Sequence, residues 1–416
     1  MSWNSGGLLW LFGGTSDSAF MGDLWTFDYT KARNDGKPSA ASWVFQGGDR
    51  NGNSNGSASS WPASRQYATS WTDSAGDLWL WSGFGSRTHN DTDGGYLNDL
   101  WRYDVRQKHW VREQAAAAAS STAATASPLG KTWANSWSTK QGDRFVFSGF
   151  GADTKIHNDM WRFTSHTRTW ELLYNYSHYH AVKVHNKTKQ VGVGLGGVYN
   201  CTSAGGAPPA PGACLLHPGA RENAYTMTDA TTGKLWLFGG SGYAFDNSSK
   251  GGMNDFWSFD AKTMRWKFEG GFADSWSKPL PNATDQTFAG WGGGRHGTLG
   301  VGSTRNLPGA DHAGYFWNDP LGGKLWLMGG ENGAKRACLE PFLHQNDRFT
   351  ETGLGRRSEN LKKRAFCAGN TDKTGHGVFS DLWSLEPSNL SWTWESGPGM
   401  NVFGSYLVSE TIDNSV

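Results

Sequence analysis

Large apolar residues occur in short stretches along the chain, and polar segments rich in glycine separate these stretches. The clearest stretch is residues 234–240, with the sequence Lys-Leu-Trp-Leu-Phe-Gly-Gly, which has a close copy at residues 324–330. Such stretches alternate large apolar residues with the period of a pleated strand that is packed on both faces. The pattern therefore predicts an all-β protein.

One tetrad, consisting of a small or polar residue, aspartate, a large apolar residue and tryptophan, occurs five times. Its aspartates and tryptophans are Asp23 and Trp25, Asp99 and Trp101, Asp159 and Trp161, Asp255 and Trp257, and Asp381 and Trp383. Four strand-like segments recur in a fixed order around each tetrad, which lies in the third. Repeated units of this kind bury their apolar faces against one another. We therefore interpret the ten tetrad residues as structural framework.

The five units form a single predicted domain over residues 1–416. Their approximate ranges are 1–46, 62–113, 128–173, 218–269 and 308–396. Residues 331–380 are expected to be a long inserted loop of the fifth unit. The tail at 397–416 contains a strand-like segment that could complete the first unit. Arg65 and Arg221 precede the first strands of their units and are expected to pair with tetrad aspartates of neighbouring units, although Asp311 breaks this pattern in the fifth.

A diglycine ends the second strand of three units, and Ser-Gly takes its place at 82–83 and 148–149. An aromatic residue or leucine then precedes the fourth-strand tryptophan by seven residues in four units. This pattern resembles the kelch repeat over nearly the whole chain, although the units exceed the usual roughly 50 residues. The resemblance implies a β-propeller of four-stranded antiparallel blades. Five blades are visible in the sequence. A propeller must close into a ring, so a sixth blade is the alternative if the five units do not close by themselves.

Long connections are expected on one face of such a propeller, because the second turns and the crossovers emerge on the same side. Binding surfaces are usually built from long loops on a rigid scaffold. We therefore expect a non-enzymatic binding or scaffold protein that holds a protein or glycan partner on this face, an expectation that rests on fold analogy. The alternatives are an enzyme acting on a carbohydrate or another small molecule in the central channel, and an intracellular kelch adaptor.

Three of the 24 tryptophans lie outside the aligned strands, namely Trp61, Trp276 and Trp291. A tryptophan in a loop can stack on the apolar face of a sugar. Arg295 and His296 follow Trp291 closely and could bind hydroxyl or carboxylate groups. These five residues are the candidate ligand-binding residues. The alternative is that the three rings cover the end of the propeller.

Composition excludes several classes of function. The formal net charge of the 416 residues is +1, which gives no overall field to attract nucleic acid. No apolar run approaches the roughly 20 residues of a membrane span. No nucleotide-binding or hydrolase motif occurs, and the spacing of His178, His180 and His185 is common without metal, so we expect neither cofactor nor metal. Copper radical oxidases are similar to kelch proteins, but the cysteines of this chain lie in insertions, so that site does not carry over.

The cysteines and glycosylation sequons suggest the compartment. Cys201 and Cys214, and Cys338 and Cys367, bracket loops and are candidate disulfides. Eight Asn-x-Ser/Thr sequons lie mostly in expected loops. We therefore expect an extracellular or luminal glycoprotein whose leader peptide is missing from a truncated chain. A cytoplasmic protein with four reduced thiols is the alternative.

Overall fold

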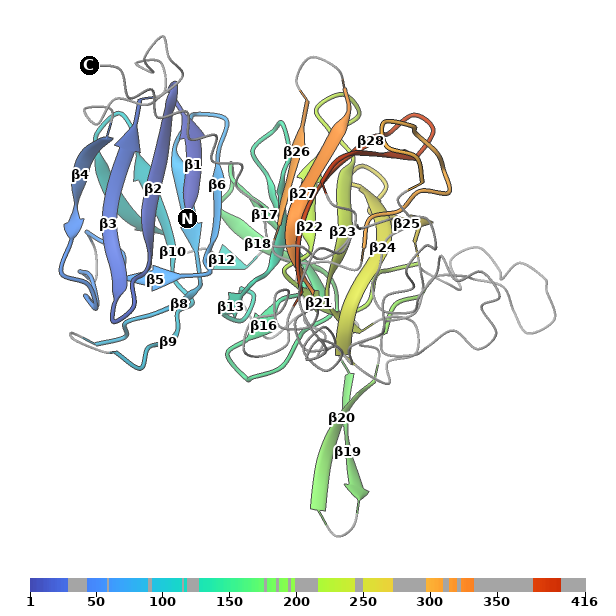
Figure 1. Cartoon of the computed structure of the whole chain (residues 1–416). Helices are drawn as coiled ribbons and strands as arrows, with labels where there is room; N and C mark the ends of the chain where they lie inside the picture. Colours follow the sequence, from blue (N-terminus) through green and yellow to red (C-terminus); the bar gives the residue numbers. More distant parts are fainter. Residues whose placement is uncertain are drawn as a thin grey trace, which may run out of the picture.

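The structure is a computed structural model that contains only β-strands and their connections in the part of the chain it describes (Figure 1). The described residues are 1–28, 43–57, 60–88, 92–113, 116–117, 127–175, 178–184, 187–193, 196–198, 216–243, 250–271, 297–309, 314–319, 323–332 and 377–397. No helix occurs among them, so none is present there to cross a membrane. The predicted all-β class is confirmed.

Most strands belong to five sheets, each built from four antiparallel strands in chain order. The first sheet contains β1 (Ser2–Ser5), β2 (Leu8–Thr15), β3 (Phe20–Phe27) and β4 (Trp43–Asp49). The second contains β6 (Thr69–Thr72), β7 (Leu78–Trp81), β10 (Leu100–Asp104) and β11 (His109–Glu113). The third contains β14 (Asn135–Ser138), β15 (Arg144–Phe147), β17 (Asp159–Thr164) and β18 (Thr169–Asn175), to which β12 (Ala116–Ala117) adds in parallel.

The fourth sheet contains β22 (Tyr225–Thr228), β23 (Leu235–Tyr243), β24 (Lys250–Asp260) and β25 (Arg265–Gly270), and β21 (Arg221–Glu222) pairs with the far end of β23. The fifth contains β26 (Tyr315–Asn318), β27 (Leu325–Asn332), β28 (Gly377–Glu386) and β29 (Ser391–Ser396). Two small sheets are formed by β5 (Arg65–Gln66), β8 (Phe84–Gly85) and β9 (Gly95–Tyr96), and by β13 (Lys131–Thr132) and β16 (Phe150–Gly151). A separate hairpin consists of β19 (His178–Val184) and β20 (Lys187–Val193).

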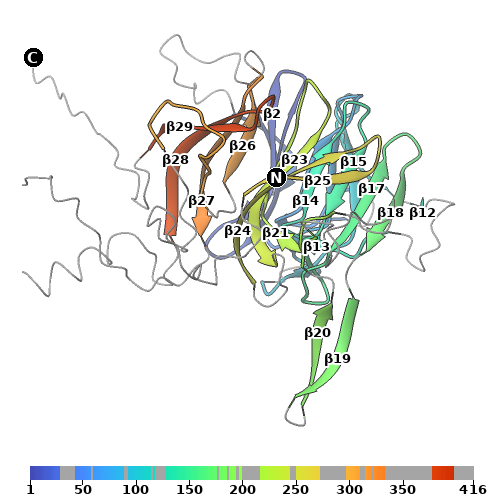
Figure 2. The ribbon, with the colours of Figure 1, turned by 90° about the vertical axis from the view of Figure 1, so that its right-hand side faces the viewer.

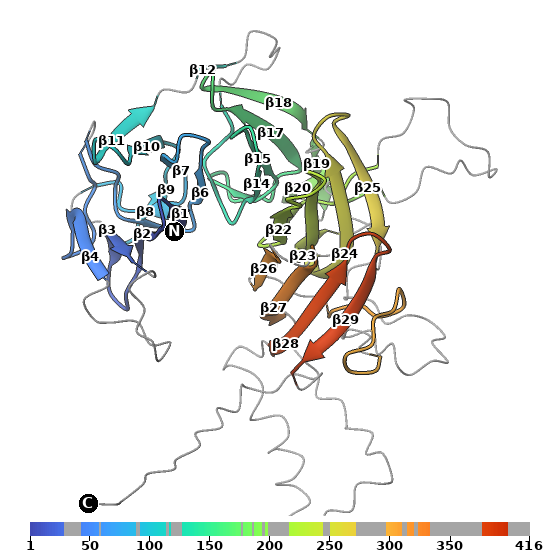
Figure 3. The ribbon, with the colours of Figure 1, turned by 90° about the horizontal axis from the view of Figure 1, so that it is seen from above.

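The five large sheets follow one another around an arc (Figure 3). The first strand of each sheet contacts the first strand of the next, so β1 lies against β6, β6 against β14, β14 against β22, and β22 against β26. The first strands therefore line the inner side of the arc, and the later strands of each sheet lie farther out.

Four hydrophobic clusters form the core, one between each pair of neighbouring sheets. Between the third and fourth sheets, for example, Phe145 and Phe147 pack with Leu237, Trp257 and other residues of the facing sheet. Strands of the inner sheets are buried on both faces, as all four residues of β7 show. This double burial explains why the sequence pattern is nearly continuous in apolar residues.

The sheets at the two ends of the arc each leave one apolar face exposed. On the first sheet, Leu9, Leu11, Trp43 and Phe45 are 38–46% exposed. On the fifth sheet, Tyr315, Trp317 and Met328 are 40–75% exposed. The inner sheets bury the counterparts of Leu11 and Trp43, and those of Tyr315, Trp317 and Met328. The outer faces of the end sheets therefore have the composition of the buried interfaces without a covering sheet in the described part of the chain.

The two Ser-Gly departures from the diglycine pattern have a physical explanation. Ser82 and Ser148 adopt the left-handed backbone, with φ of +64° and +60°, that glycine occupies more easily at the same place in other units. The Ser82 hydroxyl donates to the carbonyl of Lys131 at 2.8 Å. The Ser148 hydroxyl accepts a hydrogen bond from the backbone N–H of Arg221 at 2.7 Å. Each serine thus fastens its sheet to the following unit.

Several expectations concern the connections. The crossover after the third sheet contains the hairpin of β19 and β20, at residues 178–184 and 187–193, which the sequence pattern does not predict. Of the predicted insertion, residues 331–332 end β27 and 377–380 begin β28, whereas 333–376 lie outside the described residues. Residues 398–416 of the tail also lie outside them. The first sheet has four strands among the described residues, all from residues 2–49.

Candidate functional site

The small strands lie on the same side of the arc, at the lower edge of Figure 1. We call this side, which carries β5, β8, β9, β13, β16 and β21, the loop face. β5, β13 and β21 come from the ends of crossovers, and β8, β9 and β16 come from the connections between the second and third strands. Both kinds of connection are the ones expected to be long. The hairpin of β19 and β20 projects beyond this face in two perpendicular views (Figures 1 and 2). Short ladders therefore hold part of the loop face in place.

The tetrads form the same hydrogen bond in all five units. The indole Nε1 of each tryptophan donates to the carboxylate two residues earlier, at 2.6–2.8 Å. The pairs are Trp25 with Asp23, Trp101 with Asp99, Trp161 with Asp159, Trp257 with Asp255, and Trp383 with Asp381. A buried indole N–H needs such an acceptor, so the aspartate is required wherever the tryptophan is buried.

Three of these carboxylates also form an ion pair with a basic residue at the end of the crossover that leads into the first strand of the unit. Arg65 binds Asp99 through two hydrogen bonds of 2.6 and 2.8 Å, and Arg221 binds Asp255 through two of 2.6 and 2.7 Å. Lys131 pairs in the same way with Asp159. Each pair lies within one unit, so the expected pairing between neighbouring units is wrong. The reason is that β5, β13 and β21 directly precede the first strand of their own unit.

The Arg65–Asp99 ion pair predicts a loss of stability in acid. Burial alone would raise the pKa of Asp99, but the charge and hydrogen bonds of Arg65 and the indole of Trp101 outweigh it, so this pKa lies below 3.8. The unfolded chain therefore binds the Asp99 proton at a higher pH than the folded protein does. The free energy of unfolding should accordingly fall as the pH drops below about 4, by up to about 1.4 kcal/mol per pH unit from Asp99.

Urea unfolding at a series of pH values between 7 and 2.5 measures this slope. The control is Arg65→Met/Asp99→Leu, which removes the titrating carboxylate together with its partner. A smaller slope is expected for the double variant, and an equal slope would show that Asp99 does not contribute to acid unfolding.

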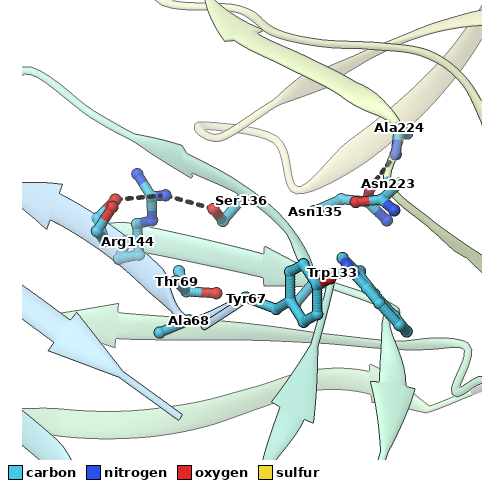
Figure 4. A pocket seen from close by; sticks show the side chains of 11 residues that line it. Tyr67, Ala68, Thr69, Trp133, Asn135, Ser136, Arg144, Asn223 and Ala224 are labelled. Carbon is cyan, nitrogen blue, oxygen red and sulfur yellow. Dashed lines mark hydrogen bonds between the residues drawn. The ribbon is translucent and has the colours of Figure 1, made fainter. Parts of the chain in front are cut away.

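A pocket of about 320 Å³ lies where the inner strands of the second, third and fourth sheets approach one another (Figure 4). We call it the axial pocket. It is lined by Tyr67, Ala68, Thr69, Ser70, Trp133, Ala134, Asn135, Ser136, Arg144, Asn223 and Ala224. Its volume falls within the range of small-molecule sites.

Three lining residues occupy one repeated position with a strained backbone. Tyr67, Trp133 and Asn223 have φ values of +58°, +53° and +53°. Each lies where the chain leaves a short strand of the loop face and enters the first strand of a large sheet. Among residues other than glycine, asparagine adopts the left-handed region comparatively often, whereas bulky residues such as tyrosine and tryptophan are outliers there. Such strain occurs preferentially at functional sites.

Tyr67 and Trp133 form an aromatic pair in the pocket, with ring centroids 4.7 Å apart and planes tilted by 44° (Figure 4). Tyr67 is 45% exposed. The side chains of Tyr67, Thr69, Trp133 and Asn223 make no hydrogen bond among the described residues. They therefore present a phenol, a hydroxyl, an indole N–H and an amide to whatever enters the pocket.

Arg144 is the charged residue of the pocket lining. Its Nη1 donates to Ser138 Oγ at 2.8 Å, and its Nη2 donates to the Ser70 carbonyl at 3.1 Å and to Ser136 Oγ. Its guanidinium lies 5.5 Å from the centre of the Trp71 ring. Burial lowers the pKa of Arg144 to about 9, so the side chain remains charged at neutral pH. The arrangement fixes a cation in the pocket.

Of the residues predicted to bind ligand, only Trp61 lies among those described. It is half-buried, donates its indole N–H to the Gly22 carbonyl at 2.8 Å, and meets Trp110 edge-on. These contacts lie between the first two sheets, and its role in ligand binding stays a prediction. Trp276, Trp291, Arg295 and His296 lie outside the described residues, as do Cys201, Cys214, Cys338 and Cys367.

The pocket residues were not among the predicted ones, although one sequence signal was available. Tyr67, Trp133 and Asn223 each come two residues after Arg65, Lys131 or Arg221, and aligning the units on those basic residues would have placed them in one column. In the described part of the chain, no group of three or more His, Cys, Asp or Glu residues could hold a metal ion.

Comparison of the sequence with models of known protein families found no match, and comparison with curated proteins found none either. The resemblance to kelch repeats therefore depends on the repeated residues of this chain alone.

Proposed function

We propose that the protein is a kelch-type β-propeller that binds a saccharide-bearing partner on its loop face, at the mouth of the axial pocket. Five repeated tetrads, five four-stranded sheets and the contacts between successive first strands support the propeller. The exposed faces of the end sheets support it further, because completion of the ring would bury them. These faces would be covered in a closed ring of five sheets, and equally in a ring that contains a sixth sheet.

The Tyr67–Trp133 pair carries the proposal of binding. Aromatic rings contact the apolar face of a sugar, and hydroxyl and amide groups at their edge bind its hydroxyls. The axial pocket supplies both kinds of group from neighbouring units. The strained backbone at the two rings is consistent with a functional rather than a structural requirement.

The composition of the pocket favours binding over catalysis. General acid–base chemistry usually employs a carboxylate or an imidazole within reach of the substrate. The described residues that line the pocket contribute one guanidinium together with aromatic, hydroxyl and amide groups. Of the sequon asparagines in the described part of the chain, Asn55, Asn175 and Asn389 are exposed, which supports the proposal of a glycosylated, extracellular or luminal protein.

A glycan array compared between the wild type and Tyr67→Ala/Trp133→Ala tests the proposal. We expect the wild type to bind a defined set of saccharides and the variant to bind them at least about tenfold more weakly, because truncation of an aromatic anchor costs about 1–3 kcal/mol. The control is Leu129→Ala, which removes an apolar side chain that is 40% exposed and not part of the pocket lining. Equal binding by the wild type and the double variant would contradict the proposal. Capture of protein partners without any saccharide would replace the proposed ligand with a protein.

A further inference from the structure

Arg144 stands at a position that is leucine in every other unit. The corresponding residues at the start of the second strand are Leu9, Leu78, Leu235 and Leu325, and the last three are fully buried. Arg144 is itself only 9% exposed. A charge in place of a core leucine is costly unless something compensates it, because burial removes the solvation of the charge.

The other buried basic residues are compensated by carboxylates. Arg65, Lys131 and Arg221 are each fully buried, and each has an aspartate partner. Arg144 has no acidic partner among the described residues. Its hydrogen-bond partners are two serine hydroxyls and one carbonyl, and its buried Nε has no partner there. The fold therefore orients this guanidinium without neutralising it.

The surroundings of Arg144 suit an anion that enters from the pocket. Arg144, Ser136 and Ser70 all line the pocket, and Figure 4 shows the guanidinium bonded to Ser136 on one wall of it. Thr69 Oγ1 and the Asn223 side chain belong to the same lining, have no hydrogen-bond partner among the described residues, and are able to bind the rest of a polar ligand. A guanidinium matches the planar geometry of an oxyanion such as a carboxylate through parallel N–H donors.

We infer that the axial pocket binds an acidic saccharide through its oxyanion, with Arg144 as the counter-ion. This inference rests on the proposed function, because it gives the chemical class of the ligand for the same site. The carboxylate of a uronate and a sulfate group offer the same chemistry to Arg144. The ring of such a sugar would meet Tyr67 and Trp133 while its charged group meets the guanidinium.

Calorimetric titration of the full chain distinguishes the two sources of charge. The probes are glucuronate, neutral glucose of the same ring size, and inorganic sulfate. Wild-type protein is expected to bind glucuronate at least about tenfold more tightly than glucose, which corresponds to about 1.4 kcal/mol. Competition by sulfate alone, without any preference for glucuronate, would assign the site to sulfate groups and overturn the uronate as the ligand.

Arg144→Gln is expected to abolish the preference for glucuronate over glucose, a loss of at least about tenfold in the ratio of the two affinities. Ser136→Ala keeps the charge and removes a hydroxyl that orients it, so it is expected to reduce the preference several-fold. This second variant keeps the inference testable if Arg144→Gln does not fold, which thermal unfolding will show.

The possible failures are distinguishable. If wild-type protein binds both sugars equally and sulfate does not compete, or if Arg144→Gln keeps the preference, the inference is wrong and the proposed saccharide binding stands. In that case the cation–π contact with Trp71 and the serine hydroxyls suffice to accommodate the charge. If wild-type protein binds neither sugar nor any member of the array, the proposed function fails together with the inference.

Discussion

Replacement of Asp255 by alanine is expected to lower the free energy of unfolding by about 3–5 kcal/mol. Asp255 and Arg221 are both fully buried, and the substitution would leave the guanidinium without its counter-ion. It would also remove the acceptor of the Trp257 indole N–H. Because globular domains are stable by only about 5–15 kcal/mol, a loss of this size should be evident as a large shift in the urea midpoint.

The first unit provides a matched control. Asp23 accepts the same indole bond from Trp25 at 2.6 Å, but it has no basic partner among the described residues. Asp23→Ala should therefore cost about 1 kcal/mol, the value of one hydrogen bond. The double variant Arg221→Met/Asp255→Leu should recover most of the loss, because it removes both buried charges. An equal loss of unfolding free energy for Asp255→Ala and Asp23→Ala would show that the Arg221–Asp255 ion pair does not stabilise the end of the crossover against its sheet.

Replacement of Leu11 by aspartate is the second large prediction, and it tests whether the ring is complete. Leu11 is 40% exposed on the outer face of the first sheet, whereas its counterpart Leu237 is fully buried between the third and fourth sheets. A completed propeller covers Leu11 with another sheet, and a buried unpaired carboxylate then costs about 3 kcal/mol or more. We therefore expect Leu11→Asp to destabilise the protein nearly as much as Leu237→Asp.

Met328→Asp examines the opposite end of the arc in the same way, since Met328 is 47% exposed on the fifth sheet. Substitutions at exposed positions usually change stability by less than about 0.5 kcal/mol. Changes of that size for both Leu11→Asp and Met328→Asp, alongside a large effect of Leu237→Asp, would show that the end faces stay uncovered and that the ring is not complete.

The sequence contained enough information to predict the strands and their repetition. Each tetrad is local, because its tryptophan bonds to the aspartate two residues earlier, and five copies make the signal strong. The pairing of Arg221 with Asp255 within one unit was mispredicted, because it depends on how the crossover end turns back onto its own sheet. The hairpin at 178–193 was missed for a different reason, since an isolated pair of strands carries little of the apolar pattern.

The pocket could not be predicted in the same way, because its residues come from three units and meet only near the inner strands. The sequence pattern places Trp133 among the tryptophans of the aligned strands, whereas it lies at a bend between β13 and β14 with a left-handed backbone. Arg144 was visible as a basic residue in a column of leucines. Its lack of an acidic partner required knowledge of the neighbouring sheet, whose Ser70 and Trp71 it contacts.

The most direct test of the central claim, that the axial pocket binds ligand, is a saccharide titration of folded Trp133→Ala protein. The ligand is the tightest binder of wild-type protein on the array, and a thermal unfolding curve verifies the fold. The account predicts a folded variant with affinity reduced at least about tenfold. Wild-type affinity in folded Trp133→Ala protein would contradict it.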